Sequence, residues 1–169
     1  MKNQSSSDIT AETVESDQVW AQAILERPGF LIRRLHQIHV SLFMEECSGF
    51  DITPVQYSIM SMVNLYPGKD QHELGQAIGV DRATLANVVA RLEKRDILRR
   101  ENASHDRRVK QVFLTRTGRN ILEQMSEPAR RAHNRTIEAL PVKCREQFMS
   151  AIKTLTEAGN VHSRAPVKS

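Results

Sequence analysis

Two helix-start signals on either side of a glycine constrain this chain more than any other feature of its sequence. Asp70 with Glu73, and then Asp81, are side chains of the type that cap helix N-termini. Gly79 lies between them and is typical of a left-handed helix end. The pattern predicts a short helix, a tight turn and a second helix, which together form a helix-turn-helix.

The second helix of this pair is amphipathic. Leu85, Val88 or Val89, and Leu92 recur at the spacing of one buried helical face. The residues between them are polar or cationic, of the types that reach base edges and phosphates from the major groove of DNA. The outward residues that we expect to bind DNA are Arg82, Thr84, Asn87, Arg91 and Lys94.

Two further helices are predicted before this pair. One begins near Pro28 and runs to about residue 46, where residues 48–51 end it. The other begins after Thr53, since Thr53, Pro54 and Gln56 form the pattern of a capping box. Two apolar stripes are expected, with Leu31, Leu35, Ile38 and Leu42 on the first helix and Val55, Ile59, Met62 and Val63 on the second.

A β-hairpin is predicted to follow the helix-turn-helix. Residues 97–100 and 109–114 have the composition of short strands, and the polar residues between them suit an exposed tip. Asp106 can orient a neighbouring arginine, so that its guanidinium enters the minor groove or contacts phosphate. The hairpin residues expected to bind DNA are Asp106, Arg107, Arg108 and Lys110.

The remaining chain returns to a helical pattern. A long helix follows residues 115–118, with Pro128 expected to kink it and Leu140-Pro141 expected to end it. A last helix runs to about residue 158. The expected buried residues are Ile121, Leu122, Met125, Ala129, Ala132 and Ile137 on the long helix, and Phe148, Ile152 and Leu155 on the last.

The predicted fold is therefore mainly α with a small β-hairpin wing, in the order α-α-α-α-β-β-α-α. We expect a flexible arm over residues 1–17, one domain over residues 18–160 and a disordered tail over residues 161–169. Within the domain, a winged helix-turn-helix occupies about residues 53–115. Helices of about residues 28–48 and 116–158 form a dimerisation stalk, because they carry more apolar surface than one small lobe can cover.

The charge of the chain is concentrated where the helix-turn-helix and the hairpin lie. Between Asp81 and Arg119, eleven Lys and Arg residues stand against five Asp and Glu residues, although the net charge of the whole chain is only +4. Such a segment favours a polyanionic partner. No long apolar run or leader pattern is present, and Cys47 and Cys144 do not form a disulfide framework, so we expect a cytoplasmic protein that does not bind membranes.

An enzyme is not expected. The sequence contains no nucleophile motif of the GxSxG type, no GxxxxGK[ST] phosphate loop and no HExxH metal motif. We therefore predict no catalytic residues and no cofactor. A winged helix used only for contacts with other proteins remains an alternative, although it does not require the outward Arg, Asn and Thr set.

The chain resembles the MarR family of bacterial transcription regulators over about residues 28–158. The resemblance is most specific in residues 81–85, 91–100, 106–108 and 114–118, although Asp96 replaces a glycine that the family pattern normally has before the wing. It implies a homodimer, two DNA-binding lobes on a pseudo-palindromic operator, and an effector pocket between the stalk and each lobe. It also suggests repression of transcription.

The effector suggested by the residues is an aromatic carboxylate or its CoA thioester. The chain resembles the subgroup of the family that controls degradation of aromatic acids. In this hypothesis Arg33 or Arg34 pairs with the acid, His36 or His39 bonds a ring hydroxyl, and Phe43 or Tyr57 stacks on the ring. Salt bridges or interface packing are alternative roles for the two arginines, as a polar helix face is for the two histidines.

Metal or redox sensing is a further alternative. His36 and His39, with Glu45 or Glu46, could supply nitrogen and oxygen ligands, but their spacing is a weak signal, and we predict no metal site. Cys47 follows two glutamates, whose negative charge disfavours a reactive thiolate. A small buried residue at a helix end is the favoured interpretation of Cys47.

Overall fold

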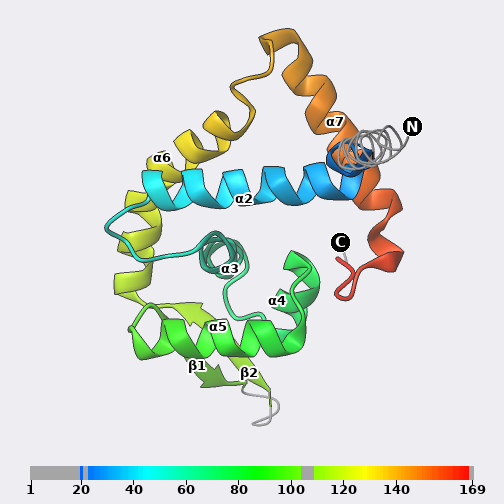
Figure 1. Ribbon diagram of the computed structural model, residues 1–169. Helices are drawn as coiled ribbons and strands as arrows, with labels where there is room; N and C mark the ends of the chain where they lie inside the picture. The colour runs from blue at the N-terminus through cyan, green and yellow to red at the C-terminus, as the bar shows by residue number, and fades with distance from the viewer. Residues whose placement is uncertain (1–19, 21–22, 104–108, 168–169) are drawn as a thin grey trace, which may run out of the picture. The chain divides into compact units, whose positions relative to one another are not determined.

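The computed structural model describes residue 20 and residues 23–103 and 109–167. The chain divides into two compact units, residues 1–39 and 40–169, and the boundary falls within the first named helix. The elements in chain order are α2 (Pro28–Glu46), α3 (Pro54–Leu65), α4 (Gln71–Ile78), α5 (Arg82–Lys94), β1 (Leu98–Asn102), β2 (Lys110–Leu114), α6 (Arg116–Ile137), α7 (Val142–Ala158) and the 3-10 turn η1 (Asn160–His162) (Figure 1). This order confirms the predicted fold class.

The predicted helix caps are present. Thr53 and Gln56 form a capping box at α3, in which the Gln56 amide N–H donates to Thr53 Oγ1 and the Thr53 amide N–H donates to Gln56 Oε1. Asp70 and Glu73 form the same box at α4. These side chains satisfy backbone N–H groups that have no partner inside the helix, and they thereby fix where each helix begins.

The buried face of α3 differs from the predicted one. Ile59 and Val63 are buried as expected, but Val55 is 36% exposed and Met62 is only half-buried. Met60 and Gln56 are buried in their place. The prediction for Val55 was wrong because the buried face of α3 passes through Gln56 and Met60 beside Ile59 and Val63, and periodicity alone does not show which of two neighbouring stripes packs on the core.

The wing is a two-stranded antiparallel hairpin. Leu98 pairs with Leu114 at its base, and Asn102 pairs with Lys110 near its tip. Both strands lie within a residue or two of the predicted segments. Residues 104–108, and with them Asp106, Arg107 and Arg108, lie outside the described residues.

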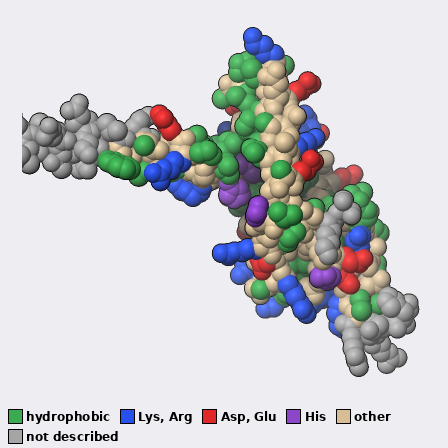
Figure 2. Space-filling model, turned by 90° about the vertical axis from the view of Figure 1, so that its right-hand side faces the viewer, with side chains coloured by type: hydrophobic (Ala, Val, Ile, Leu, Met, Phe, Trp, Pro, Cys, Tyr) green, Lys and Arg blue, Asp and Glu red, His purple; other side chains and the backbone are tan. Residues whose placement is uncertain are grey.

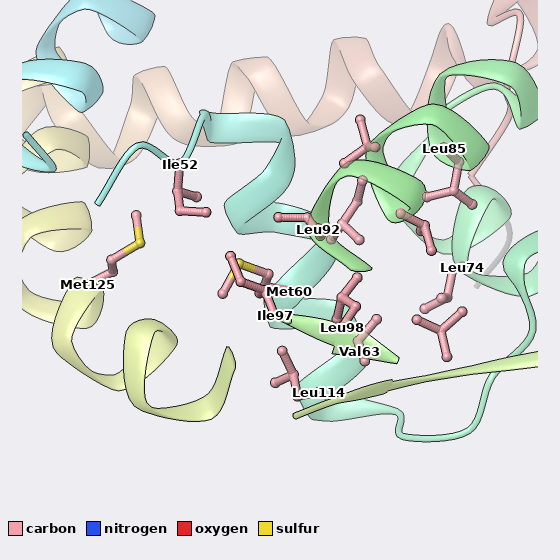
Figure 3. Close-up of a cluster of buried hydrophobic side chains, with 14 of the residues drawn as sticks. Ile52, Met60, Val63, Leu74, Leu85, Leu92, Ile97, Leu98, Leu114 and Met125 are labelled. Atoms are coloured by element: carbon pink, nitrogen blue, oxygen red, sulfur yellow. The ribbon is translucent and has the colours of Figure 1, made fainter. Parts of the chain in front are cut away.

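The hydrophobic core of residues 40–169 joins the helix-turn-helix, the wing and α6. Leu74 of α4 and Leu85 and Leu92 of α5 point into it together with Met60 and Val63 of α3 (Figure 3). Met125, Ala129 and Ala132 add the buried face of α6, while Ile121, Leu122 and Ile137 of that helix are half-buried. This shared core holds α5 on the side that the sequence predicted for it, with Leu85, Val88, Val89 and Leu92 inward.

The last helix is less buried than the sequence suggests. Phe148 and Ile152 are half-buried and Leu155 is 68% exposed, so the prediction of a buried Leu155 is wrong for the single chain. Hydrophobic side chains also reach the surface on the face shown in Figure 2. Among the described residues, no helix is both long and apolar enough to cross a membrane.

Candidate DNA-binding surface

The outer face of α5 carries the five side chains that the sequence singled out. Arg82, Thr84, Asn87, Arg91 and Lys94 are all exposed. They lie opposite the buried leucines and valines of the same helix, so the packing of α5 on the core determines which side chains are presented to solvent.

The N-terminal end of α5 is fixed by Asp81. Its Oδ1 accepts a hydrogen bond from the Thr84 amide at 3.0 Å, and its Oδ2 accepts one from Thr84 Oγ1 at 2.6 Å. These hydrogen bonds hold the pKa of the Asp81 carboxyl below its ordinary value. The Thr84 hydroxyl donates its proton to Asp81, so toward any other partner its oxygen can act only as an acceptor.

The basic residues of this region fall into two groups. Arg99 pairs with Glu101 and Arg100 pairs with Glu93, and the pairing with Arg100 lowers the pKa of the Glu93 carboxyl. On the outer face of α5, by contrast, Arg82, Arg91 and Lys94 form no ion pair with any carboxylate in the described part of the chain. Their charge is therefore not neutralised by any carboxylate of the described residues.

The described part of the wing contributes Lys110 to the same region. Lys110 Nζ donates to Asn102 Oδ1 at 2.5 Å across the hairpin, which orients the ammonium group next to the start of the tip. The predicted contacts of Asp106, Arg107 and Arg108 lie outside the described residues and stay predictions.

Arg95, at the end of α5, is a positioning residue that the sequence analysis missed. Its guanidinium donates to the carbonyl oxygens of Phe50 at 3.0 Å and Asp51 at 2.5 Å, and it lies 3.5 Å from the Asp51 carboxylate. It therefore ties the C-terminal end of α5 to the loop between α2 and α3. These partners are more than forty residues away in the chain, so no local pattern could have identified them.

The predicted effector residues of the second unit form an aromatic cluster. Phe43 is buried, and its ring lies 5.6 Å from the Tyr57 ring and 6.4 Å from the His133 ring, measured between centroids. Tyr57 is half-buried, which raises the pKa of its hydroxyl, and it lines a hollow of about 730 Å³ with Ser61, Arg119 and other residues of α3 and α6. Sequence spacing could not have found His133, since α6 brings it to Phe43 only after folding.

The other predicted effector residues lie in the first unit. Arg33 and Arg34 both donate to Gln37 Oε1 at 3.3 Å, and the Arg33 guanidinium lies 5.1 Å from the centroid of the Phe30 ring. His36 is exposed and His39 is half-buried. Their role in ligand binding stays a prediction.

His36, His39, Glu45, Glu46 and Cys47 are the residues with side chains suited to sensing a metal or an oxidant. Within the described ranges, no group of three His, Cys, Asp or Glu side chains is arranged to hold a metal ion. Glu45 and Glu46 instead pair with Arg131 and Arg135 of α6. Cys47 is buried, and this burial raises the pKa of its thiol, an effect that nearby Glu46 strengthens.

This surface lies in a part of the chain that is similar to known transcription regulators. The sequence pattern described as MarR family matches residues 52–110, which span the helix-turn-helix and most of the wing. The transcriptional regulator HosA of Escherichia coli O127:H6 is 30% identical over 124 residues, which cover 73% of this chain and 90% of HosA.

Two solved structures have a similar fold. BpsR of Bordetella bronchiseptica, whose DNA binding is regulated by 6-hydroxynicotinic acid, matches with a TM-score of 0.74 at 26% identity, covering 78% of this chain and 94% of that one. The transcriptional repressor CouR, bound to a 23-mer DNA duplex, matches with a TM-score of 0.73 at 25% identity, covering 79% and 94%.

Proposed function

Because the chain belongs to the MarR family of transcriptional regulators, we propose that it is a repressor that binds a pseudo-palindromic operator as a homodimer. Its relatives regulate transcription and are not enzymes. In each subunit α5 enters the major groove, and the wing, with Arg107, Arg108 and Lys110, contacts the adjacent backbone or minor groove. The DNA-bound CouR neighbour supports this assignment.

The observation that carries the proposal is the unneutralised outer face of α5. The guanidinium groups of Arg82 and Arg91 and the ammonium group of Lys94 are exposed without an acidic partner in the described chain. Thr84 and Asn87 lie among them, and an Asn amide can bond both N6 and N7 of adenine. The cationic groups hold the protein on phosphates while the shorter polar groups distinguish bases.

Two substitutions separate these roles in a DNA-binding titration on operator and scrambled duplexes. Asn87→Ala is expected to relax base preference by about 1–3 kcal/mol of discrimination, with little change on scrambled DNA. Arg108→Ala is expected to weaken binding to all sequences alike. Lys153→Ala, on the exposed face of α7, is the matched control. Equal binding by wild type and Arg108→Ala would remove the wing from the DNA-binding surface.

The effector in this proposal is an aromatic carboxylate or its CoA thioester, and its binding releases the operator. Arg33 or Arg34 takes the acid group, His36 or His39 bonds a ring hydroxyl, and Phe43 or Tyr57 packs on the ring. Two observations support this assignment. The Phe43 and Tyr57 rings already adopt a tilted packing at 5.6 Å, and BpsR responds to an aromatic acid.

A panel of phenolic acids and their CoA thioesters, added to the protein–operator complex, tests the effector. One compound is expected to lower operator affinity, and by linkage the operator lowers the affinity for that compound by the same factor. In the double variant Arg33→Gln/Arg34→Gln, release should require a higher concentration of that compound. Unchanged operator affinity at saturating concentrations of every compound would contradict the effector while leaving DNA binding intact.

A further inference from the structure

The last described residues form a closed loop where the sequence suggests a frayed tail. Residues 160–167, called here the C-terminal segment, begin with η1 and turn back on themselves. Asn160 Nδ2 donates to the Val167 carbonyl oxygen and the Val167 amide N–H donates to Asn160 Oδ1, both at 2.8 Å. The Ala165 amide donates to Ser163 Oγ at 3.2 Å. The reciprocal pair at Asn160 fixes both ends of the loop.

This segment lies against the turn of the helix-turn-helix. A Cβ atom placed on Gly79 would be 3.1 Å from Val167 Cγ2 and 3.4 Å from the Ala165 carbonyl oxygen. Gly79 is the residue with φ +71° that ends α4 and directs the chain into α5. Figure 1 shows the C-terminus returning to α4. The segment therefore covers the turn that sets the position of the recognition helix.

The contact brings a further arginine to the start of α5. Arg164 and Arg82 line one hollow of about 360 Å³, together with His72, Gln76 and Asp81. The Asp81 carboxylate in this hollow already accepts two hydrogen bonds from Thr84. Arg164 is exposed and forms no ion pair within the described residues.

We propose that the C-terminal segment is part of the DNA-binding surface and that Arg164 contacts a DNA phosphate next to the one held by Arg82. The proposed partner of Arg164 is the phosphodiester backbone of DNA. An exposed guanidinium has several N–H donors that suit phosphate oxygens, and such contacts position a protein on DNA without reading the base sequence. The inference rests on the proposed function, since it places Arg164 beside a face of α5 assigned to DNA.

The salt dependence of operator binding tests this role. Each phosphate contact contributes about 0.9 to the slope of log affinity against log salt. Because the proposed homodimer carries two copies of Arg164, Arg164→Gln is expected to reduce the slope by about 1.8, and to weaken binding to operator and scrambled DNA by the same factor. Asn160→Ala, which frees the segment but keeps its charge, is expected to produce part of the same loss. Lys143→Gln, at the opposite end of α7, removes the same charge elsewhere and should leave the slope unchanged.

The outcomes separate the two proposals. If wild type does not bind DNA at low salt, the proposed function fails. If wild type binds but Arg164→Gln has the same salt slope as wild type, the role of Arg164 is overturned and the proposed function stands. The same holds if Lys143→Gln reduces the salt slope as much as Arg164→Gln does. If Arg164→Gln reduces the salt slope but Asn160→Ala changes neither the slope nor the affinity, the hydrogen bonds of Asn160 do not position Arg164. Equal melting temperatures of the variants show that folding is not the cause of any loss.

Discussion

Asp96 shows how a single residue can follow a family pattern in conformation while departing from it in chemistry. The family pattern has a glycine here, and Asp96 adopts φ +54°, the left-handed region that glycine occupies without steric cost. Two threonines surround it. Thr115 Oγ1 donates to the Asp96 carbonyl oxygen at 2.6 Å and Thr117 Oγ1 donates to its carboxylate at 3.2 Å. The departure therefore leaves the turn into the wing intact.

Two substitutions at this position should differ in stability. Both Asp96→Gly and Asp96→Ala lose the hydrogen bond from Thr117, but only glycine also removes the strain of the left-handed backbone. Asp96→Ala is expected to have a free energy of unfolding about 1 kcal/mol below that of Asp96→Gly. Urea unfolding followed by circular dichroism measures the difference, and equal stabilities would show that the positive φ carries no cost.

Gly118 is a second residue whose identity is explained only by the structure. It is buried in the first turn of α6, and a Cβ atom there would lie 2.1 Å from the Ile97 carbonyl oxygen and 2.9 Å from Leu114 Cδ2. Gly118→Ala is expected to lower the free energy of unfolding by about 2 kcal/mol or more, because backbone must move to admit the methyl group. Ala151→Gly, at an exposed position of α7, is a control for the intrinsic helix propensity of glycine. A Gly118→Ala variant as stable as wild type would contradict this packing.

At the scale of elements, the sequence predicts helix ends better than helix faces. Caps depend on residues three apart, so Thr53 with Gln56 and Asp70 with Glu73 could be identified without a structure. The face of α3 depends on what packs against it, and Val55 was placed wrongly for that reason. The link from Arg95 to the loop after α2 depends on tertiary folding and leaves no local signal.

The end of α2 is joined to α6 by a pH-sensitive set of ion pairs. Glu46 accepts hydrogen bonds from Arg131 and Arg135, both at 2.8 Å, and these hold the pKa of its carboxyl below the ordinary value of 4.5. Because the pKa is lowered in the folded state, the pairing stabilises the protein fully above pH 4.5. That contribution is lost as the pH falls below this value and the carboxyl becomes protonated.

The difference in free energy of unfolding between wild type and Glu46→Gln separates the contribution of Glu46 from those of the other carboxyl groups. Wild type is expected to be the more stable of the two at pH 7, and the difference should shrink as the pH falls below about 4.5. Urea unfolding at a series of pH values measures it. A difference that stays constant through the acidic range would show that the Glu46 charge does not stabilise the contact between α2 and α6.

At the scale of the whole molecule, apolar surface remains uncovered in the single chain. Val142 and Leu155 on α7 are 77% and 68% exposed, and Leu31 and Ile32 on α2 are more than half exposed. Leu155 was predicted to be buried because helical periodicity identifies the apolar face of a helix. Periodicity does not show whether that face packs within its own chain or against a second chain. These surfaces support the proposed homodimer, as exposed apolar patches of this kind mark protein contacts.

The proposed DNA-binding surface contains side chains that the sequence predicted and one, Arg164, that it did not. The sequence predicted that five side chains of α5 face outward, and all five are exposed, because the buried residues of an amphipathic helix determine which side chains face solvent; their contact with DNA stays a prediction. It did not predict Arg164, which reaches that region only because the C-terminal segment packs on Gly79. Residues brought together by tertiary contacts are the part of a site that sequence periodicity leaves out.

The assignment of the α5 surface to DNA is tested most directly by the binding of wild-type protein to the DNA that flanks its own gene, measured by fluorescence anisotropy at increasing salt. We predict that binding saturates at two chains per operator and that the protein binds the operator more tightly than scrambled DNA. The logarithm of the affinity should fall linearly with the logarithm of the salt concentration. The slope should be several units, because both subunits contact phosphates. Absence of binding at low salt, or binding that salt does not weaken, would contradict the assignment of the α5 surface to DNA.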